Sequence, residues 1–316
     1  MKFLIVDKRK RVGDLTTPHY AVTRLVEELS SRHIECDLAY FDEIDFFVKE
    51  GKFDITIQNK PLTNYTHIIL RGHRTKLEYM IKKYIVDVAE QNSIKVQNSE
   101  FMKVSTFYDK LFQMKYMSEN NIAHLDSAYT LDGKYYEKPE LIQNIGFPMV
   151  YKHVEGENRI ERIEDEDKNK KNVFLANNIE ELKSLCIEHD SPEETFINKP
   201  SQYFIQKYVD IGEDYRALVI GGKYVGGYKR EATQNFITVS KGNYTPHDNP
   251  DPEFIKLTEE TAALFKADFC AMDIIYSDGK PYILEINMNP TFKAMETKVD
   301  GKPVDIAKLI IEQMLQ

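Results

Sequence analysis

The chain has 316 residues, and 42% of them are hydrophobic, which is enough for two or three packed subdomains and excludes a disordered protein. Its 51 acidic residues outnumber its 42 basic ones, and the net charge of -9 argues against a general nucleic-acid or anionic-membrane surface. No apolar run is long enough for a signal-peptide core or a membrane span, so we expect a cytoplasmic protein. The cysteines Cys36, Cys186 and Cys270 lack a CxxC spacing and are expected to be buried thiols.

The N-terminal part of the chain alternates apolar runs with helical patterns. Strands are predicted at residues 3–7, 35–40 and 66–72, and a helix at residues 20–32 lies between the first two. A second helix is predicted at residues 76–92, where the apolar residues at helical spacing are Leu77, Met80, Ile81, Tyr84, Ile85 and Val88. Strands that alternate with helices predict a mostly parallel sheet covered by helices.

Shorter elements follow, and they indicate a small second unit. The segment 106–121 has a helical pattern, residues 126–131 are predicted as a strand, and a short helix is expected before Gly146. Residues 148–154 form an apolar strand that contains one lysine, Lys152.

Beyond residue 200 the pattern is dominated by strands, which are predicted at residues 203–209, 215–220 and 223–231. The Gly-Gly pair at 221–222 is a two-residue turn that joins the last two strands into a hairpin. A second hairpin turns at the Asp-Gly pair 278–279, between an amphipathic helix at 252–267 and a final helix at 303–315. Antiparallel structure is therefore expected in this part of the chain.

The second hairpin carries polar residues in otherwise apolar strands. Asp273 lies on its first strand, and Glu285 and Asn287 lie two residues apart, hence on one face, of the returning strand. Two carboxylates and an amide oxygen are hard donors of the kind that magnesium prefers, whereas buried unpaired carboxylates are costly. The alternative is an edge hairpin with a polar outer face.

Asp273, Glu285, Asn287 and the following Pro290 resemble the pattern that ends the nucleotide site in the ATP-grasp superfamily. The resemblance is specifically to carboxylate–amine ligases typified by the ribosomal-protein glutamate ligases. It implies that Asp273, Glu285 and Asn287 hold two Mg²⁺ ions, with Mn²⁺ as an alternative, that bridge the phosphates of ATP and neutralise charge as the γ-phosphoryl group moves.

The same resemblance implies the fold and its division. The expected class is α/β, with α+β character in the C-terminal part. An N-terminal parallel-sheet pre-ATP-grasp domain would span residues 1–100, a central ATP-grasp subdomain residues 101–200, and a C-terminal ATP-grasp subdomain residues 201–316.

Two lysines upstream match phosphate-binding positions of the family. Lys110 belongs to an Asp-Lys pair that opens a helix, and the alternative for it is a surface lysine. Lys152 ends the pattern Gly-x-Pro, two apolar residues, x-Lys, which runs from Gly146 into the predicted strand. By resemblance, Lys152 contacts the α- and β-phosphates. The alternative for Lys152 is a lysine that snorkels at a strand edge.

The segment around residues 203–216 resembles the hinge that holds adenine by main-chain hydrogen bonds. Gln206, Lys207 and Tyr208 match the hinge, although Lys207 replaces the acidic residue more usual there. Asp214 matches the acidic position that binds the ribose.

Arginines complete the site that the resemblance implies. Arg216 and Arg230 would face the transferring phosphoryl group or a substrate carboxylate, for which a planar guanidinium is suited. A cross-strand ion pair is the alternative for Arg216. Asn235 matches, loosely, an asparagine that lines the site. Arg71 ends a predicted strand and could hold a substrate carboxylate, but a solvated charge is favoured.

The loop after Lys152 departs from the family. A glycine-rich loop over the phosphates is usual there, yet after Gly156 the expected glycine positions are Arg159 and Glu161. Either Arg159 replaces the lost backbone contacts or the loop closes differently, while the acidic run 164–167 is expected in a solvated turn.

Three functions are compatible with these residues. The first is an ATP-dependent ligase that joins a carboxylate to an amine through an acylphosphate and releases ADP and phosphate. The second is a ligase that forms side-chain amide or ester crosslinks in a precursor peptide, and the third is a nucleotide-binding module without ligase activity, which the intact metal set disfavours. The expected partners are small-molecule or peptide carboxylate and amine substrates, without nucleic acid or membrane; homo-oligomerisation stays open, and the sequence does not name the substrates.

Overall fold

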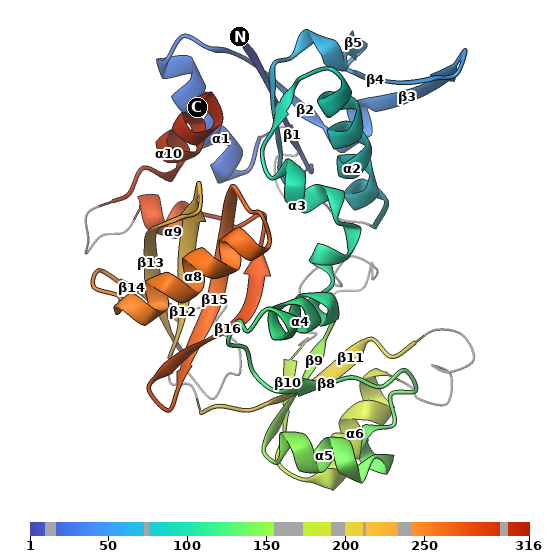
Figure 1. Cartoon of the computed structure of the whole chain (residues 1–316), viewed down its shortest axis with the longest axis vertical. Coiled ribbons are helices and arrows are strands. Elements are labelled where there is room, and N and C mark those ends of the chain that lie inside the picture. Colours follow the sequence, from blue (N-terminus) through green and yellow to red (C-terminus); the bar gives the residue numbers. More distant parts are fainter. Residues whose placement is uncertain are drawn as a thin grey trace.

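A computed structural model describes residues 1–9, 17–72, 76–154, 173–190, 200–210, 213–232, 242–297 and 303–316. Figure 1 shows a central unit at the bottom of the view, joined through helix α4 to an upper part in which the first and last segments of the chain lie together. Within the described residues no helix is long and apolar enough to cross a membrane.

The N-terminal unit is built on a parallel sheet with strand order β2-β1-β6-β7, as the alternating pattern predicts. Its strands are β1 Lys2–Asp7, β2 Glu35–Tyr40, β6 His67–Leu70 and β7 Lys95–Val96, and its long helices are α1 Tyr20–Ser31 and α2 Lys76–Gln91. Strand β1 is buried from Phe3 to Val6 because both faces of a parallel sheet are covered.

Helix α2 forms where predicted, but it turns a different face to the sheet. Leu77 and Met80 are 64% and 47% exposed, whereas Lys82 is 1% exposed and lies beside buried Val86 and Ala89. The prediction from helical spacing, in which these apolar residues face the sheet, is therefore wrong for Leu77 and Met80 at the N-terminal end of the helix. The helix has two overlapping apolar stripes, and periodicity alone does not determine which of them meets the sheet.

A three-stranded antiparallel sheet between β2 and β6 was not expected from the sequence. It consists of β3 Ile44–Lys49, β4 Lys52–Ile57 and β5 Lys60–Pro61. Glu50 and Gly51 form the turn between β3 and β4 with φ of 53° and 77°, a conformation that glycine adopts readily. The signal that could have revealed it is the apolar alternation in "FDITI" beside a Glu-Gly turn.

The central unit has an antiparallel sheet with order β10-β9-β11-β8. Its elements are β8 Ser127–Ala128, α5 Pro139–Ile145, β9 Met149–His153, β10 Val173–Ala176, α6 Ile179–His189 and β11 Tyr203–Lys207. Strand β10 and helix α6 were not predicted, and the strand expected at 126–131 is only two residues long. Tyr135, Tyr151 and Tyr203 are buried in the core of this unit.

Helix α4 Lys110–Glu119 connects the units and is shorter than predicted. The chain first makes a 3₁₀ turn, Ser105–Tyr108, and the Asp109 side chain then accepts a hydrogen bond of 2.9 Å from the Phe112 N–H as the N-cap of α4. This cap places Lys110 at the first position of the helix.

The C-terminal sheet has order β14-β13-β12-β15-β16 and is antiparallel throughout, as predicted. Its elements are β12 Glu213–Ile220, β13 Lys223–Ala232, β14 Gly242–Pro246, α8 Pro252–Leu264, β15 Phe269–Ser277 and β16 Lys280–Asn287. Both expected two-residue turns form. Each short turn sets the register of the residues next to it, and a register shift farther along each hairpin, at Leu218/Val219 and at Asp273/Ile274, changes the pairing beyond it.

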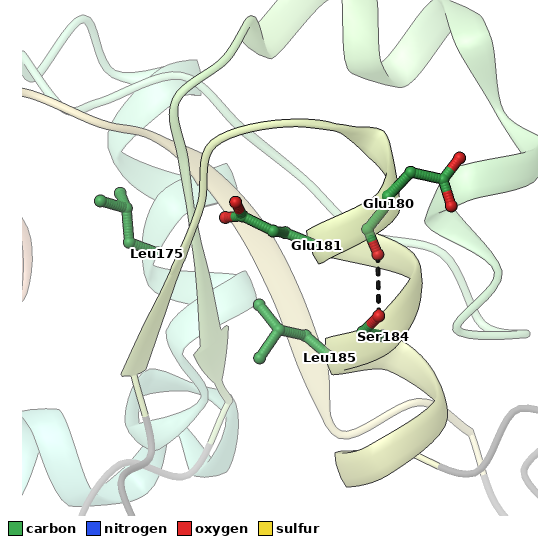
Figure 2. Close-up of a pocket in the computed structure, with 5 residues that line it drawn as sticks. All are labelled: Leu175, Glu180, Glu181, Ser184 and Leu185. Atoms are coloured by element: carbon green, nitrogen blue, oxygen red, sulfur yellow. Dashed lines mark hydrogen bonds between the residues drawn. The ribbon is translucent and has the colours of Figure 1, made fainter.

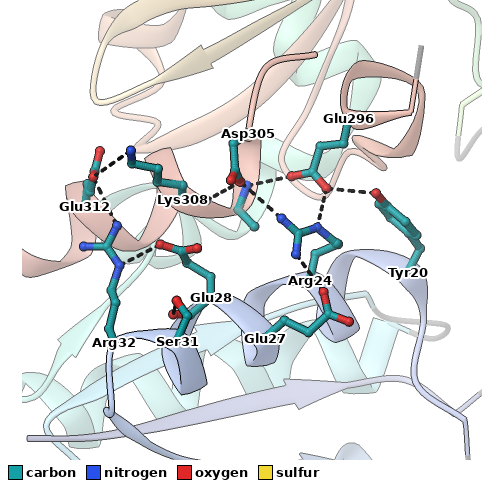
Figure 3. A network of polar contacts seen from close by, with 11 residues as sticks. Tyr20, Arg24, Glu27, Glu28, Ser31, Arg32, Glu296, Asp305, Lys308 and Glu312 are labelled. Atoms are coloured by element: carbon teal, nitrogen blue, oxygen red, sulfur yellow. Dashed lines mark hydrogen bonds and ion pairs between the residues drawn. The ribbon is translucent and has the colours of Figure 1, made fainter. Parts of the chain in front are cut away.

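The C-terminal end of the chain packs on its N-terminal unit. Helices α9 Lys293–Glu296 and α10 Ile306–Leu315 share one buried core with α1 and with residues of the C-terminal sheet. In the contact network of Figure 3, the Arg24 Nε and the Tyr20 hydroxyl each donate to the Glu296 carboxylate at 2.9 Å, and the Arg32 Nη2 donates to Glu312 of α10 at 3.1 Å. The first and last helices are thus held together by apolar and charged contacts.

Asn98 joins the N-terminal unit to the C-terminal sheet just before helix α3 Ser99–Lys103. Its buried amide donates to the Phe269 carbonyl at 2.8 Å and accepts from the Phe269 N–H at 2.9 Å. Asn98 has φ of 59°, which asparagine tolerates better than alanine.

We expect Asn98→Ala to lower the free energy of unfolding by about 3 kcal/mol, because it adds left-handed strain to the loss of two buried hydrogen bonds. Asn121 provides a matched control: it has φ of 58° but is exposed, so Asn121→Ala should cost only about 1 kcal/mol. Urea unfolding measures both values, and equal losses would contradict a role for the Asn98 bonds.

Candidate active site

A row of charged side chains crosses one face of the C-terminal sheet. The register pairs Arg230 with Asp214 between β13 and β12, and Arg216 with Asp273 between β12 and β15. Asp273 in turn lies opposite Glu285 on β16, because a register shift between Asp273 and Ile274 moves it away from Leu284, the partner that counting from the Asp-Gly turn gives. Opposed residues on antiparallel strands share a face, so sheet pairing brings these side chains together.

Asp273 is held by two arginines. Arg216 donates to both of its oxygens, at 2.7 Å from Nε and 2.8 Å from Nη2, and Arg230 Nη2 lies 3.2 Å from Oδ1. Burial alone would raise the pKa of Asp273, but the two guanidinium groups hold it well below its usual range. The cross-strand ion pair considered for Arg216 is present, and it includes a predicted metal-binding residue.

Glu285 is held by the two predicted phosphate-binding lysines. Lys110 Nζ lies 2.5 Å and Lys152 Nζ 3.6 Å from the same oxygen, Oε2. Burial raises the pKa of Glu285, but the ammonium groups outweigh it and lower the pKa to about 2. Burial also lowers the pKa of Lys152 to about 8.

The alternatives for these lysines are wrong. Lys110 is not a surface lysine, since 16% of its side chain is exposed, and Lys152 lies on β9, an inner strand of the central sheet, rather than at a strand edge. The contact from Lys152 to Glu285 also brings the central and C-terminal sheets together at the charged row.

The charges of this network fit a magnesium nucleotide. Its members are Lys110, Lys152, Arg216, Arg230, Asp214, Asp273 and Glu285. The basic members outnumber the acidic ones by one, so the network is not an anionic cage for a bare cation. Carboxylates beside lysines and arginines suit a ligand that carries cations and phosphates together, because each sign meets its opposite.

Asn287 is a less direct match. It shares the face of Glu285 two residues along β16, opposite Ala271, and its Oδ1 accepts a hydrogen bond of 2.8 Å from the Asn289 N–H. No group of three or more His, Cys, Asp or Glu side chains in the described part of the chain could hold a metal ion. Any metal set here therefore depends on Asp273 and Glu285, with the amide oxygen as a third donor.

The hinge residues lie on and just after β11. Gln206 is buried, and its amide donates to the Ser127 hydroxyl at 3.0 Å. The Lys207 N–H donates to the Asp126 carbonyl at 2.8 Å, while its side chain is exposed. Tyr208 is half-buried, and its hydroxyl donates to Asp210 at 3.2 Å.

Asp214 has a second partner that its predicted ribose contact did not anticipate. Both of its oxygens accept hydrogen bonds from Arg230, at 2.7 and 2.5 Å, and the pair is buried. Burial raises the pKa of Asp214, although Arg230 opposes that shift. In this structure Asp214 orients Arg230, and a ribose contact would require a change in that pair.

Several predicted positions lie outside the described residues. These are Asn235, Gly156, Arg159, Glu161 and the acidic run 164–167. Their predicted roles stay predictions.

A pocket elsewhere in the central unit is not part of this site. Leu175, Glu180, Glu181, Ser184 and Leu185 line it between β10 and α6, where Figure 2 shows the Ser184 hydroxyl bonded to the Glu180 carbonyl. None of the predicted site residues lines this pocket, and its two carboxylates would repel a triphosphate.

Buried cations at the end of the N-terminal sheet were missed. Arg71 is 5% exposed, so the prediction that it is a solvated charge is wrong. Its Nη2 donates to the Pro290 carbonyl at 2.7 Å.

Lys82 is a second buried cation, with no hydrogen-bond or ion-pair partner within the described ranges. Its ammonium lies 5.9 Å from the centre of the Phe41 ring. Burial lowers the pKa of Lys82 to about 7. The position of Lys82 on the inner stripe of α2, beside Val86, was the available signal.

Comparisons with known proteins show the family and the fold of this chain. The model of the RimK-like ATP-grasp domain matches residues 108–314. A probable alpha-L-glutamate ligase of Marinomonas sp. is 24% identical over an alignment of 321 positions that covers 99% of this chain and 95% of that protein. A protein of the same description from Psychromonas ingrahamii is 25% identical over an alignment of 328 positions that covers 99% of this chain and 94% of that protein.

Solved structures share the fold. The ATP-grasp ligase PsnB, complexed with minimal precursor, Mg and ADP, superposes with a TM-score of 0.66 at 15% identity. The match covers 99% of this chain and 97% of the PsnB chain. A RimK-domain ATP-grasp protein of Sphaerobacter thermophilus has a TM-score of 0.66 at 13% identity, with 99% of each chain covered.

The family match, the named relatives and the shared fold define an ATP-dependent carboxylate–amine ligase of the ATP-grasp class. The family match extends from helix α4 through the charged hairpin to α10. The chain belongs to the RimK-like ATP-grasp family.

Proposed function

We propose that the charged row is the catalytic centre of this ligase and that two Mg²⁺ ions bind there, with Mn²⁺ as an alternative. The observation that carries the proposal is that Asp273 and Glu285 lie opposite each other while each contacts two cationic side chains. Asp273, Glu285 and the Asn287 amide would hold the metal ions. When bound, the ions would neutralise negative charge that develops as the γ-phosphoryl group moves.

The basic residues would then change partners. Lys110 and Lys152, which now share one oxygen of Glu285, would bind phosphate oxygens as point charges. Arg216 and Arg230 would orient the transferring phosphoryl group or the substrate carboxylate through their planar donors. Gln206, Lys207 and Tyr208 would hold the adenine through main-chain groups, and Asn235 would line the site.

The proposed reaction needs no covalent bond to the protein. ATP phosphorylates a substrate carboxylate to an acylphosphate and ADP leaves; the amine attacks the acyl carbon, and phosphate leaves. The chain's residues position the reactants and stabilise charge, which supply much of the rate in phosphoryl transfer.

We infer that glutamate is one of the two substrates. The support is that sequence relatives aligned along nearly the whole chain are named alpha-L-glutamate ligases. A precursor peptide is the second candidate substrate, because PsnB and the macrocyclase MdnC have the same fold and their structures are described with precursor peptides bound. Those structures are less than 20% identical to this chain, so the sequence relatives favour glutamate ligation.

The test is an ADP-release assay with MgATP, L-glutamate and a panel of amino acids, short peptides and candidate acceptor proteins. We expect release to require both a carboxylate and an amine, with glutamate as one of them. Release that depends on a peptide without glutamate would favour the second candidate. Absence of nucleotide binding by the folded protein would overturn the whole proposal.

Lys152→Met is expected to weaken MgATP binding about 10- to 100-fold, because one charge-assisted contact to phosphate is lost. Isothermal titration with MgATP measures the change. Lys115→Met is the matched control, since Lys115 is exposed and pairs only with Glu119 on the surface of α4 among the described residues. Unchanged affinity in Lys152→Met would remove Lys152 from the proposed site.

A further inference from the structure

Strand β3 is the outermost strand of its sheet. The order β3-β4-β5 leaves one side of β3 without a partner strand in the described part of the chain. Figure 1 shows the β3–β4 hairpin projecting from the N-terminal unit beside α2, with its turn away from the body of the molecule. An exposed edge of this kind presents unpaired backbone groups that another strand can bind.

The hairpin geometry determines which backbone groups are available. Because Glu50 and Gly51 form a two-residue turn, the flanking residues Lys49 and Lys52 are a hydrogen-bonded backbone pair. Every second residue of β3, counted back from Lys49, is bonded to β4 in the same way. The Gln58 N–H bonds the Glu43 carbonyl at 3.0 Å, in agreement with this alternation. The N–H and C=O groups of Ile44, Phe46 and Val48 therefore point outward from the sheet.

The side chains of this edge are apolar and exposed. Phe47 is 50% and Val48 82% exposed. Phe46 and Phe53 pack against Tyr84 of α2 with ring centres 6.2 and 6.0 Å away, which makes the edge continuous with the exposed face of that helix. We call this surface the edge patch; its members are Phe46, Val48, Phe53, Leu77, Met80 and Tyr84 on the helix-covered face of the hairpin, together with Phe47 on the opposite face. Contiguous exposed apolar surface of this kind marks interaction sites.

We propose that a second copy of this chain occupies the edge patch by antiparallel pairing of β3 with its symmetry mate, with the two-fold axis at Phe47. The result would be one continuous six-stranded sheet, β5-β4-β3 followed by β3-β4-β5 of the second copy. Such a two-fold interface is self-complementary by construction.

Charge complementarity selects this register. Outward-pointing residues of both strands must face each other, which leaves two central registers, one centred on Phe46 and one on Phe47. With Phe47 at the centre, Phe46 lies opposite Val48, and Asp45 lies opposite Lys49 of the second copy, twice by symmetry. With Phe46 at the centre, Asp45 lies opposite Phe47, and no charge pair forms between residues of β3; Glu43, which precedes the strand and would face Lys49, already pairs with Arg9.

Asp45 and Lys49 are available for this pairing. Asp45 has no hydrogen bond or ion pair within the described residues, and the ion pair of Lys49 there is to its neighbour Glu50 at 3.9 Å, with both side chains 83% exposed. Opposite charges that face each other across antiparallel strands stabilise the pairing, and like charges weaken it. An extended peptide could also add to this edge, but only a second copy supplies both charge pairs by symmetry.

Sedimentation velocity of the full chain over a range of concentrations tests the proposal. We expect a concentration-dependent dimer, and we expect Val48→Lys to raise its dissociation constant about 100-fold, because the interface would desolvate an ammonium that has no carboxylate partner there. Leu131→Lys is the matched control, because Leu131 is 64% exposed in the central unit, and it should leave the dimer unchanged.

Charge reversal tests the register. Asp45→Lys and Lys49→Asp should each raise the dissociation constant on the order of tenfold, because each creates two like-charged pairs. The double variant Asp45→Lys/Lys49→Asp should restore the wild-type value. All of these positions are exposed or half-buried, and thermal unfolding checks that each variant is folded.

A chain that stays monomeric at about 100 µM would overturn the proposal, since the affinity would then be weaker than that of specific complexes. A dimer that Val48→Lys does not weaken would place the interface elsewhere. A monomer whose Val48→Lys variant loses binding of a peptide substrate would assign the edge to a peptide instead.

Discussion

Glu285→Gln is expected to lower the rate of ADP release by on the order of 10³-fold. Glu285 lies opposite Asp273 and contacts Lys110 and Lys152, so it connects the proposed metal ions to the phosphate-binding side chains. Glutamine keeps the shape of the side chain but removes the charge that a divalent cation requires. The loss should therefore appear in turnover even at saturating ATP.

The measurement is steady-state ADP release at several MgATP and Mg²⁺ concentrations. Glu119→Gln is the matched control, because Glu119 forms an exposed pair with Lys115 and should leave turnover within twofold of the parent. If Glu285→Gln released ADP as fast as the parent, the proposed metal site would be wrong. Comparison of far-UV circular dichroism ensures that a lost rate is not lost folding.

Asp273→Leu is expected to lower the free energy of unfolding by about 3–5 kcal/mol. The variant leaves Arg216, whose side chain is only 14% exposed, without its carboxylate, and it leaves Arg230 with Asp214 alone. A buried guanidinium that loses its partner retains its desolvation penalty. The destabilisation should occur with or without nucleotide, because it comes from the ion network of the sheet itself.

Urea unfolding at pH 7 measures this change. The double variant Asp273→Leu/Arg216→Met should recover part of the loss, because it removes the uncompensated charge together with the carboxylate. Asp87→Leu is the control: Asp87 forms an exposed pair with Lys83 on α2 and should change stability by no more than about 0.5 kcal/mol. Equal stabilities of Asp273→Leu and the parent would show that the row contributes nothing to folding.

The same pair predicts a pH dependence. Because Arg216 and Arg230 hold the pKa of Asp273 below its ordinary value of 3.8, the stabilisation is present above that value and declines as the pH falls below it. The parent should therefore lose more stability than Asp273→Leu between about pH 5 and pH 2. Identical slopes for the two proteins in this range would contradict the depressed pKa.

The carboxylate hairpin could be predicted because its turn is a local signal, but the pairing of Asp273 with Glu285 could not. Counting from the Asp-Gly turn places Asp273 opposite Leu284, and a register shift between Asp273 and Ile274 brings it opposite Glu285 instead. The family resemblance then related Lys110 and Lys152 to the same nucleotide site. That both ammonium groups meet one oxygen of Glu285 follows from the packing of helix α4 and the central sheet against the hairpin.

The partner of Asp214 could not be predicted in the same way. Its position two residues before Arg216 shows that the two share a face, but its bidentate bond to Arg230 depends on the register of β12 and β13 as well as on burial. The predicted ribose contact considered Asp214 alone. In a row of alternating charges, each side chain has more than one available partner, and the folded sheet decides among them.

The sequence by itself determined the family, the alternation of the N-terminal unit, both C-terminal hairpins and the identity of the charged row. These depend on short-range periodicity and turn chemistry, which act within a few residues. Only the tertiary structure decided which stripe of α2 meets the sheet, and hence that Lys82 is buried while Leu77 and Met80 are exposed. The physical reason is that a helix with apolar residues on two overlapping stripes can bury either one, and the free energy that selects between them comes from the sheet and the β3–β4 hairpin packed against it.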